Sequence, residues 1–421
     1  MPKMKFSFGI TKVVGCLCVL ATFTLSASPQ TYSVIHNFTG GPGGNYPYDG
    51  LTMDRAGNFY GTTYGGGSSG QGIVFKLSKH NTSWIFTPIY SFRGGNDGAF
   101  PYAGVTIGPD GNLYGTTSSG GLGAPECPGG CGTVYKLTPP ANICHSTSCS
   151  WSETVLYNFY QAGVGLSTPW AGVIFDAAGN MYGTTTEGGA GGCPSPGCGA
   201  VYKLTRTGVS WTATIIYSFT GYSDGAVPYA GLVMNSAGDL YGASFYSGGL
   251  YQGYGAIFEL INSGGNWSER TLYDFQGGND GGNPEGGLII DAAGNLYGGT
   301  SEANGNYLTG VAFELSPSGS NWTYSVLASF NGSIVANLSL DSAGDLYGTT
   351  LFGGAHGFGS VFKLSNSGGG WTPTDLHDFS NQNHDGFGPW CNVAIDVSGN
   401  LFGTTNGGGT TGGGIIWEIT P

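Results

Sequence analysis

The chain alternates between short runs of apolar and β-branched residues and clusters of Gly, Asn, Asp and Ser, a pattern typical of strands joined by tight turns. In the first clear unit, an inner strand at residues 51–53 leads through a turn at Ala56-Gly57-Asn58 to a second strand at residues 59–63. A third strand is expected at residues 73–77 and an outer strand at residues 84–92. This order predicts a four-stranded antiparallel sheet with two apolar faces.

The same unit recurs along the whole chain, marked each time by the glycine of its first turn. Seven glycines mark it, at spacings of 54, 68, 59, 56, 50 and 55 residues: Gly57, Gly111, Gly179, Gly238, Gly294, Gly344 and Gly399. A repeat of about 50 to 60 residues suits a four-stranded propeller blade with generous loops. The sequence therefore predicts one domain, a seven-bladed β-propeller over residues 29–421. Its repeat cores are expected near residues 50–63, 104–117, 172–185, 231–244, 287–300, 336–350 and 392–405.

The two ends of the chain predict how the ring closes. The last unit stops after its third strand, at residues 415–419, and has no outer strand of its own. Residues 31–38 match the outer-strand pattern and precede the first inner strand. Pairing them with the last unit would complete the seventh blade and leave no open sheet edge.

Two strand motifs carry a family resemblance. One is Gly-Asn-Leu-Tyr-Gly-Thr-Thr at residues 111–117, and the other is Gly-Ser-Val-Phe-Lys-Leu at residues 359–364. With these motifs the chain resembles the GloVer tandem-repeat proteins over essentially everything that follows residue 28. The resemblance implies a repetitive β architecture and no particular activity.

Composition supports an all-β globular protein. The 421 residues include 82 Gly and 20 Pro, and only 9% are charged. Long helices are excluded because glycine costs about 1 kcal/mol at a helix interior position. Disorder is excluded as well, because 14% aromatic and 39% hydrophobic residues supply enough apolar surface for a core.

Residues 1–28 are predicted to be a secretory signal peptide. A basic stretch ending at Lys12 precedes an apolar run at residues 13–25 and the small residues 26–28. Cleavage there would remove three of the 12 basic residues and leave 9 basic against 25 acidic residues, a net charge of −16. Nucleic-acid binding is excluded because no cationic cluster remains. We expect an exported monomer, secreted or held at the cell surface, with no transmembrane segment.

An aromatic residue that follows Pro just before the inner strand is the first candidate binding feature. It recurs in five units as Tyr48, Tyr102, Trp170, Tyr229 and Trp390. These rings could stack on sugars at the mouth of the central channel. The alternative is that they seal the tops of the blade interfaces, because buried aromatic residues dominate core energetics.

Acidic linkers before the inner strands are candidate calcium sites. They contain Asp97, Asp224, Asp280 and Asp385, next to Asn side chains and backbone carbonyls. Calcium prefers such oxygen ligands. The same residues are also ordinary turn formers, so turn formation without a metal is the alternative. No other cofactor is expected.

Ionisable residues that break the repeat are candidates for catalysis. They lie on the loop-rich face: Glu187, Glu285, Glu302, His356, His384 and Asp385. Glycoside cleavage commonly uses two carboxylates, one as the acid and one as the base or nucleophile. The alternative is that they are solvated loop residues. His36 and His377 fill outer-strand positions where other units carry Tyr, so a structural role is expected for them.

Seven cysteines follow the predicted signal peptide. Six form close pairs in loop insertions, Cys127 with Cys131, Cys144 with Cys149, and Cys193 with Cys198. In an oxidising compartment these pairs predict disulfides. Cys391 replaces a small residue of the other units and is expected to be a buried free thiol.

Three functions remain open from the sequence. The leading hypothesis is an exported interaction module that binds a glycan or a cell-envelope component through the loop-rich face. The second is a polysaccharide-cleaving enzyme, a lyase or a hydrolase, on the same face. The third is a structural surface protein that contacts other proteins.

Overall fold

A computed structural model describes residues 30–123, 127–140, 151–160, 165–190, 192–194, 196–247, 252–368 and 370–421. The predicted signal peptide, residues 1–28, and the pair Cys144 and Cys149 lie outside these ranges. Among the described residues, no helix is long and apolar enough to cross a membrane.

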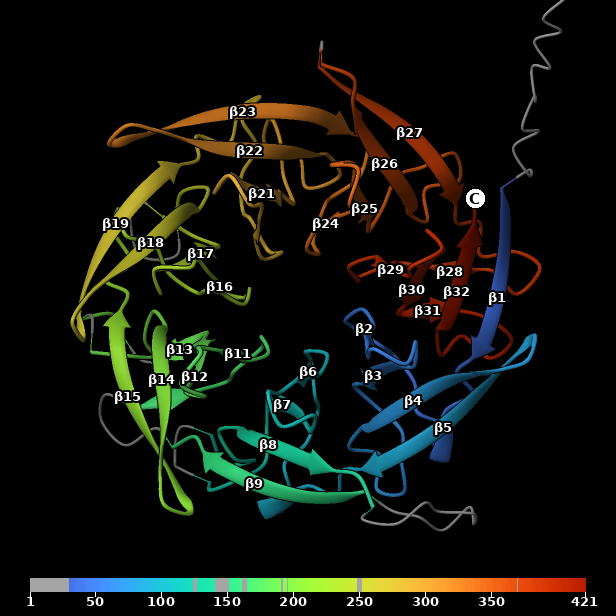
Figure 1. Cartoon of the computed structure of the whole chain (residues 1–421), viewed down its shortest axis with the longest axis horizontal. Helices are drawn as coiled ribbons and strands as arrows, with labels where there is room; N and C mark the ends of the chain where they lie inside the picture. The colour runs from blue at the N-terminus through green and yellow to red at the C-terminus, as the bar shows by residue number, and fades with distance from the viewer. Residues whose placement is uncertain are drawn as a thin grey trace, which may run out of the picture.

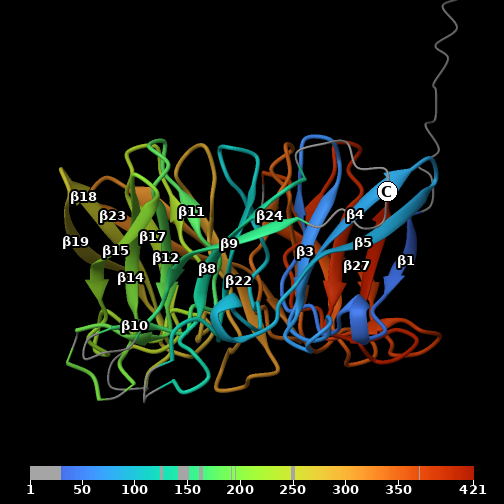
Figure 2. The same ribbon diagram turned by 90° about the horizontal axis from the view of Figure 1, so that it is seen from below.

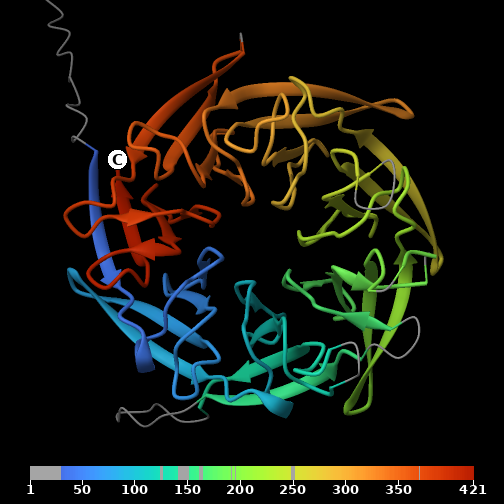
Figure 3. The same cartoon turned by 180° about the vertical axis from the view of Figure 1, so that it is seen from behind.

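Seven four-stranded antiparallel sheets surround one axis, as the sequence predicts (Figures 1 and 3). The inner strands are β2 (Thr52–Met53), β6 (Thr106–Ile107), β11 (Ile174–Phe175), β16 (Val233–Met234), β20 (Ile289–Ile290), β24 (Ser339–Leu340) and β29 (Ala394–Ile395). The second strands are β3 (Phe59–Thr63), β7 (Leu113–Thr117), β12 (Met181–Thr185), β17 (Leu240–Ser244), β21 (Leu296–Gly299), β25 (Leu346–Thr350) and β30 (Leu401–Thr405).

The third strands are β4 (Ile73–His80), β8 (Thr133–Thr138), β14 (Ala200–Thr207), β18 (Ala256–Ser263), β22 (Gly310–Ser318), β26 (Ser360–Asn366) and β32 (Ile415–Thr420). The outer strands are β5 (Ser83–Ser91), β9 (Ser152–Asn158), β15 (Ser210–Ser218), β19 (Asn266–Asp274), β23 (Asn321–Phe330), β27 (Trp371–Asp378) and β1 (Thr31–Asn37). Two short two-stranded antiparallel sheets pair β10 (Leu166–Ser167) with β13 (Glu187–Gly188) and β28 (Gly386–Phe387) with β31 (Gly407–Gly408). Two 3-10 helices are η1 (Gly41–Gly43) and η2 (Gly95–Asp97).

Burial follows the position of a strand in its blade. Every residue of the second strands is buried, because neighbouring blades cover both sheet faces. In the outer strand β5 the exposed and less exposed positions alternate at first, since one of its faces meets solvent. The propeller core is thus a series of clusters between successive sheets.

The glycine of each Tyr-Gly or Phe-Gly pair packs against an aromatic ring. A Cβ at Gly61 would fall 2.5 Å from the ring of Phe75, on the third strand of the same blade. The other six glycines meet a Tyr, Phe or Trp of their own third strand in the same way. Any larger residue would push that ring out of the core.

The amino-terminal strand closes the ring, which confirms the sequence prediction. Strand β1 pairs antiparallel with β32, from Thr31 opposite Thr420 to Asn37 opposite Ile415. Phe38, at its end, is fully buried. The seventh blade therefore joins the two ends of the described chain (Figure 1).

A repeated hydrogen bond joins successive blades, and it accounts for the first threonine of the Gly-Thr-Thr motif. The hydroxyl of Thr62 donates to the carbonyl of Ala103 in the next blade, at 2.9 Å. Thr116, Thr184, Thr349 and Thr404 make the same bond across four further interfaces. Ala243 and Gly299 replace the threonine at the remaining two interfaces.

The long loops gather on one face of the ring. Figure 2 shows the outer strand β1 running toward this loop-rich face, where the linkers to the inner strands begin. The hairpin turns after the first and third strands lie on the opposite face. This arrangement follows from the antiparallel strand order and agrees with the assignment of loops made from the sequence.

Candidate functional site

The five candidate aromatic residues, which we call the rim residues, each lie just before an inner strand: Tyr48, Tyr102, Trp170, Tyr229 and Trp390. The proline that precedes each rim residue is buried. Before Tyr102 this proline is Pro101, and a Cβ at Gly72 would collide with its ring, so glycine is required where the two blades meet. The residue that follows Tyr102 is Ala103, whose carbonyl accepts the Thr62 hydroxyl. The blade-to-blade hydrogen bond therefore anchors the backbone next to the aromatic side chain.

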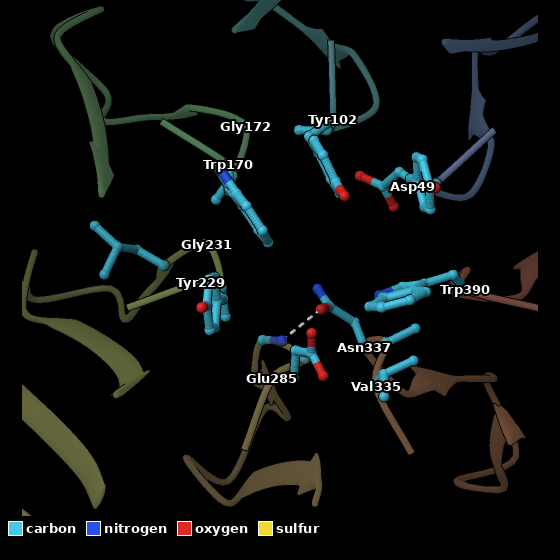
Figure 4. A pocket seen from close by; sticks show the side chains of 18 of the residues that line it. Asp49, Tyr102, Trp170, Gly172, Tyr229, Gly231, Glu285, Val335, Asn337 and Trp390 are labelled. Atoms are coloured by element: carbon cyan, nitrogen blue, oxygen red, sulfur yellow. Dashed lines mark hydrogen bonds between the residues drawn. The ribbon is translucent and has the colours of Figure 1, made fainter. Parts of the chain in front are cut away.

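The five rim residues, Tyr48, Tyr102, Trp170, Tyr229 and Trp390, gather at one end of the central channel. The ring of Tyr102 stacks on Tyr48, with centroids 4.8 Å apart, and on Trp170, at 4.5 Å. Tyr229 follows Trp170 at 4.7 Å with a 36° tilt, and Trp390 meets Tyr48 at 5.8 Å and nearly at right angles. Both faces of Tyr102 are therefore covered, and Figure 4 shows its hydroxyl directed into the channel.

A cavity of about 210 Å³, which we call the channel-mouth cavity, lies among these rings. The polar side chains Asp49, Glu285 and Asn337 also line it, on the first, fifth and sixth blades. Figure 4 shows Glu285 and Asn337 side by side, facing Tyr102 and Trp170 across the channel. Ring closure is what brings these three positions together.

Asp49 is held rigidly by backbone groups. Its carboxylate accepts hydrogen bonds from the amides of Gly50 and Gly104, each at 2.6 Å. Burial raises the pKa of the Asp49 carboxyl, and the two amide hydrogen bonds oppose that rise. Asp49 thus bridges the first and second blades at the cavity wall.

Glu285 occupies the rim position that carries Tyr or Trp in five other blades. Burial raises the pKa of its carboxyl to about 7. Asn337 is fixed beside it, because the Asn337 Oδ1 atom accepts the Gly287 amide at 2.6 Å. A carboxyl that titrates near neutral pH can exchange a proton under physiological conditions.

The structure leaves the other candidate catalytic residues outside this cavity. Glu187 accepts hydrogen bonds from the hydroxyls of Ser167 and Thr168. Glu302 is buried in a bridge with Gly282, and burial raises the pKa of its carboxyl. His356 and His384 are exposed on their loops. Of the six candidates, Glu285 alone lines the cavity.

The four candidate calcium ligands fasten the linkers to the outer strands. Asp224 accepts the Tyr217 hydroxyl at 2.9 Å and the Thr220 amide at 2.7 Å. Equivalent bonds are made by Asp97, Asp280 and Asp385. Among the residues that the structure describes, no group of three or more His, Cys, Asp or Glu is placed to hold a metal. Calcium binding at these loops stays a prediction.

The two outer-strand histidines, His36 and His377, stand where other blades carry tyrosine, and both stack on aromatic rings. His377 stacks on Tyr32 at 3.6 Å and contacts the Asp385 carboxylate at 3.3 Å. His36 stacks on Phe86 at 3.8 Å, and burial lowers the pKa of His36 to about 4. Both side chains therefore stabilise contacts between neighbouring blades.

Two of the three predicted disulfides lie within the described residues, and both are formed. Cys127 bonds to Cys131, and Cys193 bonds to Cys198. Cys391 is a buried free thiol, as predicted, and burial raises the pKa of that thiol to about 12. The disulfides fit an oxidising compartment.

Sequence reasoning did not single out Asp49 or Asn337. Asp49 stands where other repeats carry Ala103, Ala171 and Ala230. Asn337 stands where five other repeats carry glycine and the last repeat carries Asn392. Both are polar departures from an apolar or small consensus. Aligning the seven repeats position by position is the sequence comparison that reveals these two residues.

A family model described as the Gloeobacter/Verrucomicrobia repeat matches residues 20–150 and 125–339. The chain belongs to this repeat family. The matched ranges span most of the propeller and confirm the resemblance drawn from the strand motifs. No curated protein sequence matches the chain.

Solved structures share the propeller fold of this repeat protein. PorZ, a surface component of the type-IX secretion system of Porphyromonas gingivalis, aligns with a TM-score of 0.53 at 13% identity, over 91% of this chain and 48% of PorZ. The chain thus spans about half the length of PorZ. A polysaccharide lyase aligns with a TM-score of 0.51 at 11% identity, over 88% of this chain and 89% of the lyase. At these identities the likeness shows the fold alone.

Proposed function

We propose that the protein binds carbohydrate in the channel-mouth cavity on its loop-rich face, outside the cytoplasm. The observation that carries the proposal is the convergence of five aromatic residues with Asp49, Glu285 and Asn337 on one cavity of about 210 Å³. Its volume is below the roughly 300–1,000 Å³ of drug-sized sites, which favours the end of a sugar chain.

The chemistry of the cavity suits a polyhydroxyl ligand. Because the rings of Tyr48, Tyr102 and Trp170 stack on one another, they offer polar tips and edges more than free faces. Tyrosine hydroxyls both donate and accept hydrogen bonds, and carboxylates accept them, which matches the donors and acceptors of a sugar. Sugar recognition here would rest on hydrogen bonds more than on stacking.

Export and a surface role complete the proposal. The two formed disulfides and the predicted signal peptide both support a secreted or surface-held protein. The same fold occurs in a polysaccharide lyase and in a bacterial surface component, so it accommodates a carbohydrate role and a surface role.

A glycan panel tests the proposal, with calorimetry on the oligosaccharides that bind. Tyr102→Phe removes one hydroxyl from the cavity. We expect it to weaken binding about fivefold to tenfold, because this is the change in affinity that the loss of one hydrogen bond causes. Tyr222→Phe removes a hydroxyl from a tyrosine that is 62% exposed and does not line the cavity, so it is the matched control. No bound glycan, or equal affinities for the two variants, would overturn the proposal.

Polysaccharide cleavage is a second candidate, favoured by one observation. Glu285 has a carboxyl pKa of about 7 and shares its cavity with the second carboxyl, Asp49. That pair could supply acid and base catalysis. Cleavage predicts new reducing or unsaturated ends on a bound polysaccharide, and their formation should stop in Glu285→Gln. Retention of glycan without new ends would exclude it.

A further inference from the structure

The channel-mouth cavity is acidic without a counter-charge. Asp49 and Glu285 both line it, and none of its described lining residues is Lys, Arg or His. The remaining ionisable groups in the wall are the phenols of Tyr48, Tyr102 and Tyr229, which carry no positive charge. The whole chain adds to this field, with a formal net charge of −13.

The two carboxylates differ in the number of hydrogen bonds that they accept from the protein. Two backbone amides donate to Asp49, so its oxygens are engaged. Within the described part of the chain, burial alone acts on the Glu285 carboxyl, and no hydrogen-bond donor to it is found. An ionised carboxylate that is partly desolvated and unpaired is unfavourable, and a cationic partner relieves that cost. Glu285 is therefore the group in the cavity that gains most from a bound cation.

The position of Glu285 also favours contact with a ligand. It occupies a rim position, and Figure 4 shows its carboxylate directed into the channel beside Asn337. Asn337 is held by the Gly287 amide at 2.6 Å, which keeps the wall next to Glu285 in place. A ligand that enters from the loop-rich face would meet this carboxylate together with the polar tips of the aromatic rim.

We propose that the ligand of this cavity is an amino sugar, whose protonated amino group pairs with Glu285 while Asp49 adds a second negative charge. The inference rests on the proposed carbohydrate function and names its ligand class. Charge-assisted hydrogen bonds are about twice as strong as neutral ones, so the amino group selects the sugar. Acidic sugars are disfavoured, because both carboxylates would repel them.

The attraction comes from the carboxylates more than from cation–π contacts. A cation is drawn to the face of an aromatic ring and not to its edge. The faces of Tyr102 are covered by Tyr48 and Trp170. Removal of the Glu285 charge should therefore abolish most of the preference for an amino sugar.

Three oligosaccharides of equal length test the inference: the tetramer of β-1,4-linked glucosamine, its fully N-acetylated form, and cellotetraose. Calorimetry on the full mature chain, near neutral pH and at low salt, should show the glucosamine tetramer binding about tenfold or more tightly than either neutral tetramer. Glu285→Gln should bring the three affinities within about threefold of one another. Glu187→Gln, a carboxylate on the same face but outside the cavity, should leave the preference intact.

A measurement on the unaltered protein supports the comparison of variants. High salt should reduce the advantage of the glucosamine tetramer, because ionic screening weakens the charge pair, and should leave neutral tetramers nearly unaffected. Equal affinities for all three tetramers would overturn the amino-sugar inference while carbohydrate binding stands. Failure of every sugar in the panel and of all three tetramers would overturn both proposals.

Discussion

At the scale of single residues, the polar side chains of the proposed binding cavity are departures from the repeat. Glu285 replaces an aromatic rim residue, Asp49 replaces the alanine of other repeats, and Asn337 replaces the glycine found in five of the repeats. All three line the channel-mouth cavity. Repeating residues such as Asp224, in contrast, hold loops and strands together. Departures from the consensus are thus better guides to the site than the consensus itself.

The raised pKa of Glu285 makes a prediction about stability. The folded protein holds this proton up to about pH 7, whereas the unfolded chain releases it near the ordinary glutamate pKa of 4.5. Between these values the native state binds more protons, so stability falls as pH rises. Each pKa unit corresponds to about 1.4 kcal/mol, so the rise from 4.5 to about 7 predicts a loss of about 3 kcal/mol across this window.

The test is thermal and chemical denaturation of the Glu285→Gln variant at several pH values. The variant should gain about 3 kcal/mol relative to the unaltered chain as the pH rises from about 4.5 through about 7, because the amide is never ionised. Glu187→Gln, which removes a carboxyl outside the cavity, serves as the control. A constant difference between Glu285→Gln and the unaltered chain at every pH would contradict the prediction.

At the scale of strands, the second strand of each blade contributes both to packing within its own blade and to contact with the next blade. Its glycine packs against an aromatic ring of the same blade, and its tyrosine packs against the next blade, as Tyr60 does against Trp151. Its first threonine also reaches the next blade, at five of the seven interfaces. The acceptors are carbonyls directly after the rim residues. The most repeated motif of the chain therefore anchors the backbone beside the five aromatic rim residues. The two interfaces that lack this threonine are those that lead to the blades of Glu285 and Asn337.

Removal of one interblade hydrogen bond should be measurable. Thr62→Val keeps the shape of the side chain but leaves the buried carbonyl of Ala103 without its donor, and we expect a loss of about 1–3 kcal/mol in the free energy of unfolding. Thr62→Ser retains the hydroxyl and should lose less. Urea denaturation followed by fluorescence checks both variants, and equal losses would argue against a role for this hydrogen bond.

At the scale of the whole molecule, stability depends on closure between the ends of the described chain. Deletion of residues 30–38 would remove β1 and the buried Phe38, and would expose the edge of β32. An open edge and an uncovered core should abolish the cooperative thermal transition and promote aggregation. The control is a chain that begins at residue 30. Circular dichroism melting checks the pair, and an unchanged melting curve in the deletion variant would contradict closure.

The sequence by itself determined the number of blades, the strand order and the closing strand, because these depend on local alternation and on a repeat that returns at nearly constant spacing. It also determined that Tyr48, Tyr102, Trp170, Tyr229 and Trp390 share one structural position. Only the tertiary structure decided that Asp49, Glu285 and Asn337 share a cavity and that Glu187, Glu302 and the loop histidines do not. Distances between blades depend on how the whole ring closes, and no local spacing along the chain encodes them.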